Sequence, residues 1–114
     1  MTTAIQRIYD LGVDFDFQYD GQWFVWDTQK AEANLKKHGI AFEEACSVFF
    51  DPIAVYEDAS AGFERREAAI GRSGGSGLLF VVHLMRTDDT IRIISARETT
   101  RKERSHYEDH AGKA

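Results

Sequence analysis

The apolar positions early in the chain predict a strand followed by a helix. Residues 23–26 (WFVW) are aromatic or branched, which is typical of a β-strand. Asp27 stands where a helix N-cap belongs, because its carboxylate can accept from the free backbone N–H groups of the first turn. The helix should run over residues 28–38 and end at Gly39, since glycine tolerates the left-handed conformation of a C-terminal cap.

The remaining pattern predicts a second short helix over residues 43–50, a run of strands and a last helix. Residues 78–85 (LLFVVHLM) are apolar on both faces of a strand, so this strand should lie centrally in the sheet. Thr100 and Glu103 have the spacing of a capping box, so the last helix should begin near Thr100 and end near residue 109. The strands are predicted over residues 53–59, 65–72, 78–85 and 90–96.

This order of elements predicts an α+β fold, in which an antiparallel sheet is packed with two N-terminal helices and one C-terminal helix. Residues 1–22 show no firm pattern, although residues 13–20 alternate apolar with acidic side chains and could form a short strand. We therefore expect an N-terminal extension over residues 1–22 and one folded domain over residues 23–110.

The composition is that of a single globular domain. The chain has 114 residues, and its hydrophobic fraction of 43% is too high for a disordered protein. The single cysteine, Cys46, cannot form a disulfide within the chain and suits a reducing compartment. No apolar run reaches the ~18–20 residues of a membrane span, and the acidic N-terminus is unlike a signal peptide. We expect a cytoplasmic protein that does not bind membranes.

The net charge of -5 hides an uneven distribution. Residues 1–22 hold four acids and one cation, and the remaining 15 acids and 13 Lys/Arg leave residues 23–114 at only -2. A body so close to neutral can still have one positive face, and local charge decides whether phosphate binds. The acidic total argues against a protein that coats DNA, so any contact with nucleic acid should be small and focused.

Two positive clusters are candidates for such a contact. Lys30, Asn34 and Lys37 would form one stripe on the first helix, beside a core-facing stripe of Ala31 and Leu35. The polar stripe could bind nucleic acid or a partner. It could equally be a solvated surface with its cations at the favourable end of the helix dipole.

Histidine and arginine positions supply candidate chemistry. His38 could act as a general acid or base, or merely cap the end of its helix. Arg92 alternates with isoleucines and should share a sheet face with Ala96, and His83 interrupts a neighbouring apolar strand. Two polar residues on adjacent strands favour an open, functional sheet face. The alternative for Arg92 is an ion pair with a carboxylate such as Glu98 or Glu108.

Further cations flank the strands. Glu64, Arg65 and Arg66 lie at the entry to a predicted strand, where charges are usually solvated, although arginine suits bidentate phosphate contact. If the last helix begins early enough, it presents a basic row of Arg97, Arg101 and Arg104. Zinc-ligand spacing, a P-loop and a dinucleotide fingerprint are missing from the sequence, so no metal or cofactor is expected. Cys46 is more typical of a small core residue than of a nucleophile.

Taken in this order, several segments resemble the BrnT family of type II toxins. The resemblance covers about residues 24–108 and excludes the N-terminal extension. It rests on W-D-x-x-K-A-x-x-N-x-x-K-H-G from Trp26 to Gly39, followed by I-R-I-I-S-A-R from Ile91 to Arg97 and R-x-x-Y-E ending at Glu108. The family implies a RelE-like α+β fold and ribonuclease activity that stalls growth. It also implies neutralisation by a BrnA-like antitoxin with a ribbon-helix-helix domain, so that DNA is bound only indirectly, through the antitoxin.

On this basis we expect RNA cleavage without metal, by attack of the ribose 2′-OH on the adjacent phosphate. The reaction needs a base, cations for the charge that grows on the phosphate, and an acid for the leaving oxygen. The hypothesis requires the arginines to meet in one open pocket. The rival interpretation is a non-catalytic interaction module, or a decayed toxin that only binds its antitoxin. The candidate catalytic residues are Arg66, Arg92, Arg97, His38, His83 and Glu64, and the candidate RNA-binding residues are Lys30, Lys37, Arg101 and Arg104.

Overall fold

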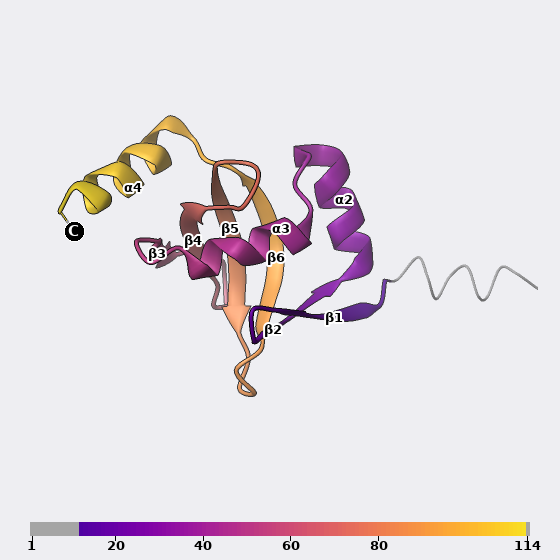
Figure 1. Cartoon of the computed structure of the whole chain (residues 1–114). Coiled ribbons are helices and arrows are strands. Elements are labelled where there is room, and N and C mark those ends of the chain that lie inside the picture. The colour runs from indigo at the N-terminus through magenta and orange to yellow at the C-terminus, as the bar shows by residue number, and fades with distance from the viewer. Residues whose placement is uncertain (1–11, 114) are drawn as a thin grey trace, which may run out of the picture.

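The computed structural model describes residues 12–113, which form one mixed sheet with helices on both faces (Figure 1). The strand order is β1-β2-β6-β5-β4-β3, and all neighbours are antiparallel except β2 and β6, which are parallel. The elements are β1 (Asp14–Tyr19), β2 (Gln22–Asp27), α2 (Thr28–His38), α3 (Phe42–Ala45), the 3-10 helix η1 (Cys46–Phe50), β3 (Val55–Asp58), β4 (Glu67–Arg72), β5 (Leu78–Met85), β6 (Ile91–Glu98) and α4 (Arg101–Lys113).

The main core lies on the sheet face that α2, α3 and η1 cover, and we call this the covered face. Figure 1 shows α3 lying across the strands and α2 beside β6. The core is apolar and fully buried, so it supplies most of the hydrophobic stabilisation of the domain. Its largest members are Phe24, Trp26, Phe42, Val48, Leu79, Val81, Ile91 and Ile93.

The opposite face is covered only in part. Tyr107 of α4 packs there on Val55, Ile70, Leu78 and Phe80, which makes a second, smaller core over β3, β4 and the start of β5. Tyr107 also donates a hydrogen bond of 2.7 Å to Asp51. Burial and this carboxylate together raise the pKa of Tyr107 to about 12. We call the remainder of this surface, over β5, β6 and β2, the open face.

A β-bulge in β6 decides which side chains reach the open face. Val82 is opposite Ser95 and His83 is opposite Ile93, so Ile94 is an extra residue without its own partner. The extra residue shifts the alternation by one, and Ala96 therefore lies in the covered core although Arg92 lies on the open face. The expectation that Arg92 and Ala96 share a face is wrong for this reason.

The side chain of Asn34 in α2 forms hydrogen bonds with the edge of β6 that a neighbouring strand would otherwise form. Beyond its short pairing with β2, β6 has an unpaired edge, and the Asn34 amide accepts from the Ala96 N–H (3.1 Å) and donates to its carbonyl (2.8 Å). The same amide donates to the Ile40 carbonyl at 3.0 Å. Asn34 is 7% exposed and Leu35 is 49% exposed, so the predicted polar and core-facing stripes of α2 are exchanged at these two positions.

The local predictions for the ends of helices are confirmed. The Asp27 side chain accepts from the Lys30 N–H at 2.9 Å, and Gly39 ends α2 with a φ of 73°. Thr100 and Glu103 form the capping box at the start of α4. The second helix begins at Phe42 and tightens into the 3-10 helix η1, and α4 continues to Lys113 instead of ending near residue 109.

The predicted strands are present, with β3 and β4 shorter than expected and β6 slightly longer. The structure also confirms the central place of β5, between β6 and β4, and the α+β fold. Of the predicted N-terminal extension, residues 1–11 lie outside the described range. Residues 14–19 form β1, which pairs with β2 in a hairpin. No helix within residues 12–113 has the length and apolar character to cross a membrane.

Replacing Asn34 with alanine should lower the free energy of unfolding by about 2–4 kcal/mol, because three buried backbone groups lose their partner. Urea unfolding followed by circular dichroism measures this loss. Lys37→Ala, an exposed change on the same helix, should stay within about 0.5 kcal/mol of the parent. A loss below about 1 kcal/mol for Asn34→Ala would show that water replaces the amide.

Candidate functional site

Arg92 is half-buried on the open face and is held by a carboxylate from β1. Its two terminal nitrogens each donate to one oxygen of Asp14 at 3.1 Å, which is a bidentate pair. The hydrogen bonds from Arg92 lower the pKa of Asp14. The partner of Arg92 is therefore Asp14, and neither Glu98 nor Glu108 pairs with it among the described contacts. An arginine in an apolar strand needs such a partner, or an anionic ligand in its place.

Arg97 lies on the same face, farther along β6. It donates to both carboxylate oxygens of Glu103 at 2.8 and 2.9 Å, and its guanidinium stacks over the Phe80 ring at 4.1 Å. The hydrogen bonds between the two side chains raise the pKa of Arg97 and lower that of Glu103. Since α4 begins at Arg101, Arg97 is outside the helix and the predicted row of Arg97, Arg101 and Arg104 does not form.

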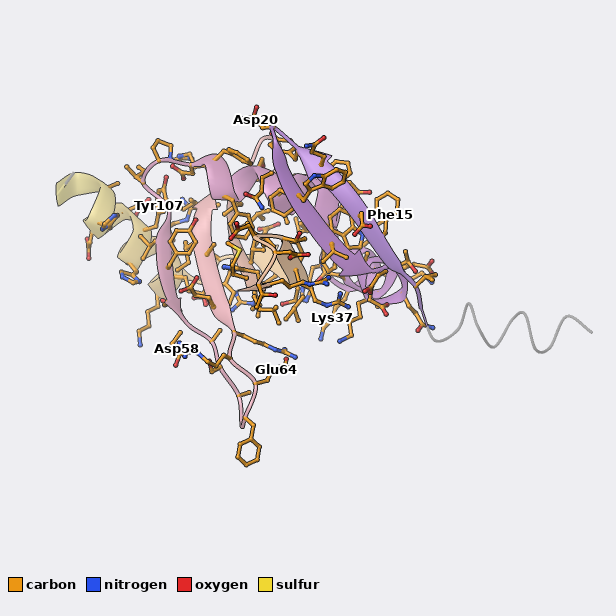
Figure 2. The ribbon with its side chains drawn as sticks, turned by 90° about the horizontal axis from the view of Figure 1, so that it is seen from below. Phe15, Asp20, Lys37, Asp58, Glu64 and Tyr107 are labelled. Atoms are coloured by element: carbon orange, nitrogen blue, oxygen red, sulfur yellow. The ribbon has the colours of Figure 1, made fainter. Side chains whose placement is uncertain are left out.

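Arg66 lies at the end of the hairpin that joins β3 to β4, where it forms an ion pair with Glu64. Figure 2 shows this hairpin projecting beyond the sheet, with Asp58 near its base and Glu64 farther out. A cavity of about 630 Å³, which we call the hairpin cleft, lies against the hairpin and the end of β5. It is lined by Tyr56, Glu57, Asp58, Ser60, Arg65, Arg66, Glu67, Leu84 and Met85.

The three candidate arginines do not meet in one pocket, so this expectation is wrong. Arg66 lines the hairpin cleft together with Leu84, and Leu84 is paired with Arg92 in the sheet. Arg97 is five residues along β6 from Arg92, roughly 15 Å at the rise of a strand. The bulge brings Arg92 and Arg97 to the same face. Arg92 and Arg97 therefore follow one face of the sheet and Arg66 lies in the hairpin, and each of the three has a carboxylate partner.

His83 lies on the opposite side of the sheet from Arg92, because it pairs with Ile93 in the register of the bulge. The prediction that His83 and Arg92 share one open face is therefore wrong. His83 is only 4% exposed and lines a second cavity of about 360 Å³, which we call the histidine pocket. Burial lowers the pKa of His83.

The two cavities share three lining residues, Tyr56, Glu67 and Met85. Glu67 is the most informative of these, because its carboxylate also lies 3.4 Å from His83 Nε2. Burial and the nearby Glu67 raise the pKa of Tyr56. Sequence analysis missed Glu67 and Tyr56. The available signal was that each lies next to a buried residue, Tyr56 after Val55 and Glu67 before Ala68. Such alternation of exposed and buried positions occurs in any half-buried strand.

The remaining candidates are distributed around the molecule. His38 is half-buried on the side of α2 that faces the sheet, one turn beyond Asn34, and it lines neither of the two cavities. Lys30 and Lys37 are exposed on α2. Arg101 and Arg104 are exposed on α4, where Arg104 pairs with Glu108 at 3.6 Å.

Nothing in the described part of the chain groups three His, Cys, Asp or Glu side chains in a way that could hold a metal ion. Cys46 is fully buried in the main core, and burial raises the pKa of its thiol to about 12. The prediction that Cys46 is a core residue is therefore confirmed. A thiol with such a pKa remains protonated near neutral pH and is a poor nucleophile.

This small α+β domain has arginines on one sheet face and in the hairpin cleft, and guanidinium groups are well suited to bind phosphate. Residues 26–103 match the family model of BrnT, a ribonuclease toxin of type II toxin–antitoxin systems. No curated protein matches the sequence. Because the family match covers more than half of the chain, the protein belongs to the BrnT family of ribonuclease toxins, which implies an RNA substrate and an antitoxin partner.

The Arg97–Glu103 pair should make stability depend on acid pH. Because Arg97 lowers the pKa of Glu103, the pair stabilises the fold above the ordinary pKa of glutamate, and this contribution disappears as the pH falls through the lowered value. Glu103→Gln, which can still cap α4, should cost about 1 kcal/mol near neutral pH once partial exposure is allowed for. The difference from the parent should shrink as the pH falls below the ordinary pKa of glutamate and vanish once Glu103 is protonated in the folded protein.

Denaturant unfolding over a series of pH values tests this expectation. Glu108→Gln is the matched control on the same helix, because its carboxylate is 57% exposed and forms only the 3.6 Å pair with Arg104. A difference between Glu103→Gln and the parent that stays constant across the pH range would assign the effect to packing instead of charge.

Proposed function

We propose that this BrnT toxin cleaves RNA without a metal ion, by attack of a ribose 2′-OH on the adjacent phosphate, in the cytoplasm. We further propose that its antitoxin is BrnA-like, with a ribbon-helix-helix domain through which the pair binds DNA. The observation that carries the catalytic proposal is the hairpin cleft, which places Arg65 and Arg66 beside several carboxylates in a cavity of about 630 Å³. Arginines can take up the charge that grows on a phosphate in the transition state.

In this proposal Arg92 and Arg97 hold the RNA backbone along the open face while Arg66 contacts the scissile phosphate. Each arginine exchanges its carboxylate for a phosphate when RNA arrives. Such exchange is cheap, because partly exposed ion pairs are typically worth only about 0–1 kcal/mol. Lys30, Lys37, Arg101 and Arg104 are exposed and would guide the flanking RNA by screened charge attraction.

The sequence nominated Glu64, His83 and His38 for the acid and base, and we rank these three by their distance from the hairpin cleft. Glu64 is beside Arg66 at the edge of the cleft, and His83 reaches the neighbouring histidine pocket. His38 lies on α2, away from both cavities, so it is the weakest of the three on geometry. We favour His83 over His38 because the histidine pocket adjoins the cleft through Tyr56 and Glu67.

The alternative is that the chain only binds its antitoxin. The observation in its favour is that Arg66, Arg92 and Arg97 each already have a carboxylate partner. A protein that does not bind RNA would need such partners permanently, since an unpaired arginine on an apolar strand is costly.

Purified protein should cleave RNA in the presence of EDTA and leave 2′,3′-cyclic phosphate ends, which mass spectrometry identifies. Arg66→Ala should slow cleavage about 30- to 1000-fold, the loss of roughly 2–4 kcal/mol of transition-state stabilisation. Arg92→Ala should lower kcat/KM by weakening the hold on the RNA backbone. Lys102→Ala, an exposed cation on α4, is the control and should change the rate less than about threefold.

Strict dependence of cleavage on added metal would refute this mechanism. Full activity of Arg92→Ala would remove that arginine from the site. An intact protein that cuts no RNA, yet still binds its antitoxin, would establish the binding-only alternative.

Expression of the chain alone should arrest growth, and co-expression of a small ribbon-helix-helix protein encoded beside it should restore growth. The colony count on inducing medium measures both effects. The Arg66→Ala variant is the control, because it should grow without the antitoxin yet still co-purify with it. Arrest that persists despite a stable complex would show that the antitoxin does not cover the catalytic surface.

A further inference from the structure

His83 is enclosed on the covered face by aromatic rings and strands. Phe49 of η1 meets its ring edge-on with centroids 4.7 Å apart, and Tyr56 of β3 does so at 6.1 Å. The imidazole ring of His83 has two polar contacts among the described residues, one at each nitrogen. A buried imidazole with two defined partners has a defined tautomer.

The contact at Nδ1 fixes where the proton lies. Nδ1 is 3.1 Å from the Val81 carbonyl oxygen, and a carbonyl can only accept a hydrogen bond, so Nδ1 carries a proton. In the neutral ring, Nε2 then has a lone pair, and it faces Glu67 Oε1 at 3.4 Å. A lone pair and a carboxylate attract one another only when a proton lies between them. The pair therefore gains a hydrogen bond when it takes up a proton.

Glu67 connects this buried nitrogen to the hairpin cleft. The Glu67 side chain is 57% exposed and lines both cavities, whereas Arg65 and Arg66 line only the hairpin cleft. A carboxylate in that place can touch a ligand in the cleft and His83 behind it. A phosphodiester held by two guanidinium groups would lie beside it.

We propose that Glu67 is the general base of this toxin and that His83 is the residue that positions it and receives its proton. This inference rests on the proposed function, because it assumes RNA cleavage through the 2′-OH in the hairpin cleft. Glu67 is a catalytic residue in this scheme, since it touches the reacting hydroxyl. His83 acts only through Glu67.

The reaction balances with these two groups and water. The 2′-O–H bond breaks, and its proton passes to Glu67 and is shared with His83 Nε2. The 2′-oxygen forms a bond to phosphorus, and the bond from phosphorus to the 5′-oxygen breaks. The departing 5′-oxygen takes a proton from water, and the proton held by Glu67 and His83 returns to solvent. The products are a 2′,3′-cyclic phosphate and a free 5′-hydroxyl.

The pH dependence of the pair is set by identified neighbours. Tyr56 faces His83 from β3, Asp58 is opposite Glu67 in the β3–β4 register, and Arg65 and Arg66 line the hairpin cleft with Glu67. The residues that line the histidine pocket from η1, β2 and β6 are uncharged and include Phe49, Gln22 and Ile91. A proton taken from solvent by the Glu67–His83 pair removes the base, so cleavage should fall on the acid side as this pair becomes protonated.

The test compares Glu67→Gln with the parent on a short RNA in EDTA. The variant should lose about 100-fold or more in kcat, while its affinity for the same RNA with a 2′-deoxy substitution at the cleavage site stays within threefold. Glu32→Gln, an exposed change on α2, is the control and should match the parent. His83→Asn should move the acid limb of the pH–rate profile, which a merely structural role would not do.

The outcomes separate the two proposals. A parent protein that makes no cyclic phosphate refutes the proposed function itself. If the parent cleaves and Glu67→Gln cleaves equally well, or loses only RNA affinity, the role of Glu67 is refuted alone. Nitrogen-15 NMR of the parent protein is independent of any variant. We expect the Nδ1–H tautomer of His83, and an Nε2–H tautomer would overturn the inference.

Discussion

Ile94 is one residue more than the pairing of β5 with β6 requires, and the layout of charge on the sheet follows from it. Without the bulge, the side chains of Arg92 and Arg97 would point to opposite faces, because they are five residues apart on one strand. One of the two guanidinium groups would then be inside the main core, where no carboxylate is available to it. The bulge keeps Ile91, Ile93 and Ala96 in that core and leaves both arginines on the other side. A bulge beside a functional surface commonly re-aims a side chain in this way.

The unequal cover of the sheet explains why the arginines can lie where they do. One face is sealed by α2, α3 and η1, and it contains most of the buried aromatic residues. The other is covered by α4 only over β3, β4 and part of β5, so a strip over β5 and β6 stays partly hydrated. Carboxylates from β1 and α4 offset the desolvation of the cations along this strip. Hence the same residues can be stable without ligand and still be open to an anion.

Sequence alone was sufficient wherever one residue and its near neighbours determine the structure. Asp27, Gly39 and Thr100 act within one helical turn, and all three were predicted correctly. Interactions between distant segments were not predictable in this way. Arg92 pairs with Asp14, which is 78 positions away in the sequence, and Asn34 bonds to Ala96, which is 62 positions away. No pattern in the neighbouring sequence indicates either pairing.

The candidate site shows the same division. Arg66 could be nominated from its chemistry and its place at the entry to a predicted strand, and the structure puts it in the hairpin cleft. The face to which His83 points depends on the bulge, which the alternating pattern of β6 does not reveal. Glu67 looked like an ordinary solvated charge, because only the pairing of β4 with β5 brings it against a buried imidazole. The family match rests on short motifs and does not supply these spatial relations.

The parallel pairing of β2 with β6 has a consequence for how the protein folds during its synthesis. β2 can pair with β1 early in synthesis, but its other edge stays unpaired until β6 has been made. The Asn34 amide also lacks its main partner until then, because that partner is the backbone of Ala96 in β6. Contacts so distant along the chain form late, because the intervening loop must be closed first. A ribosome translating this toxin therefore carries an unfinished sheet until β6 has been made and has left the ribosome.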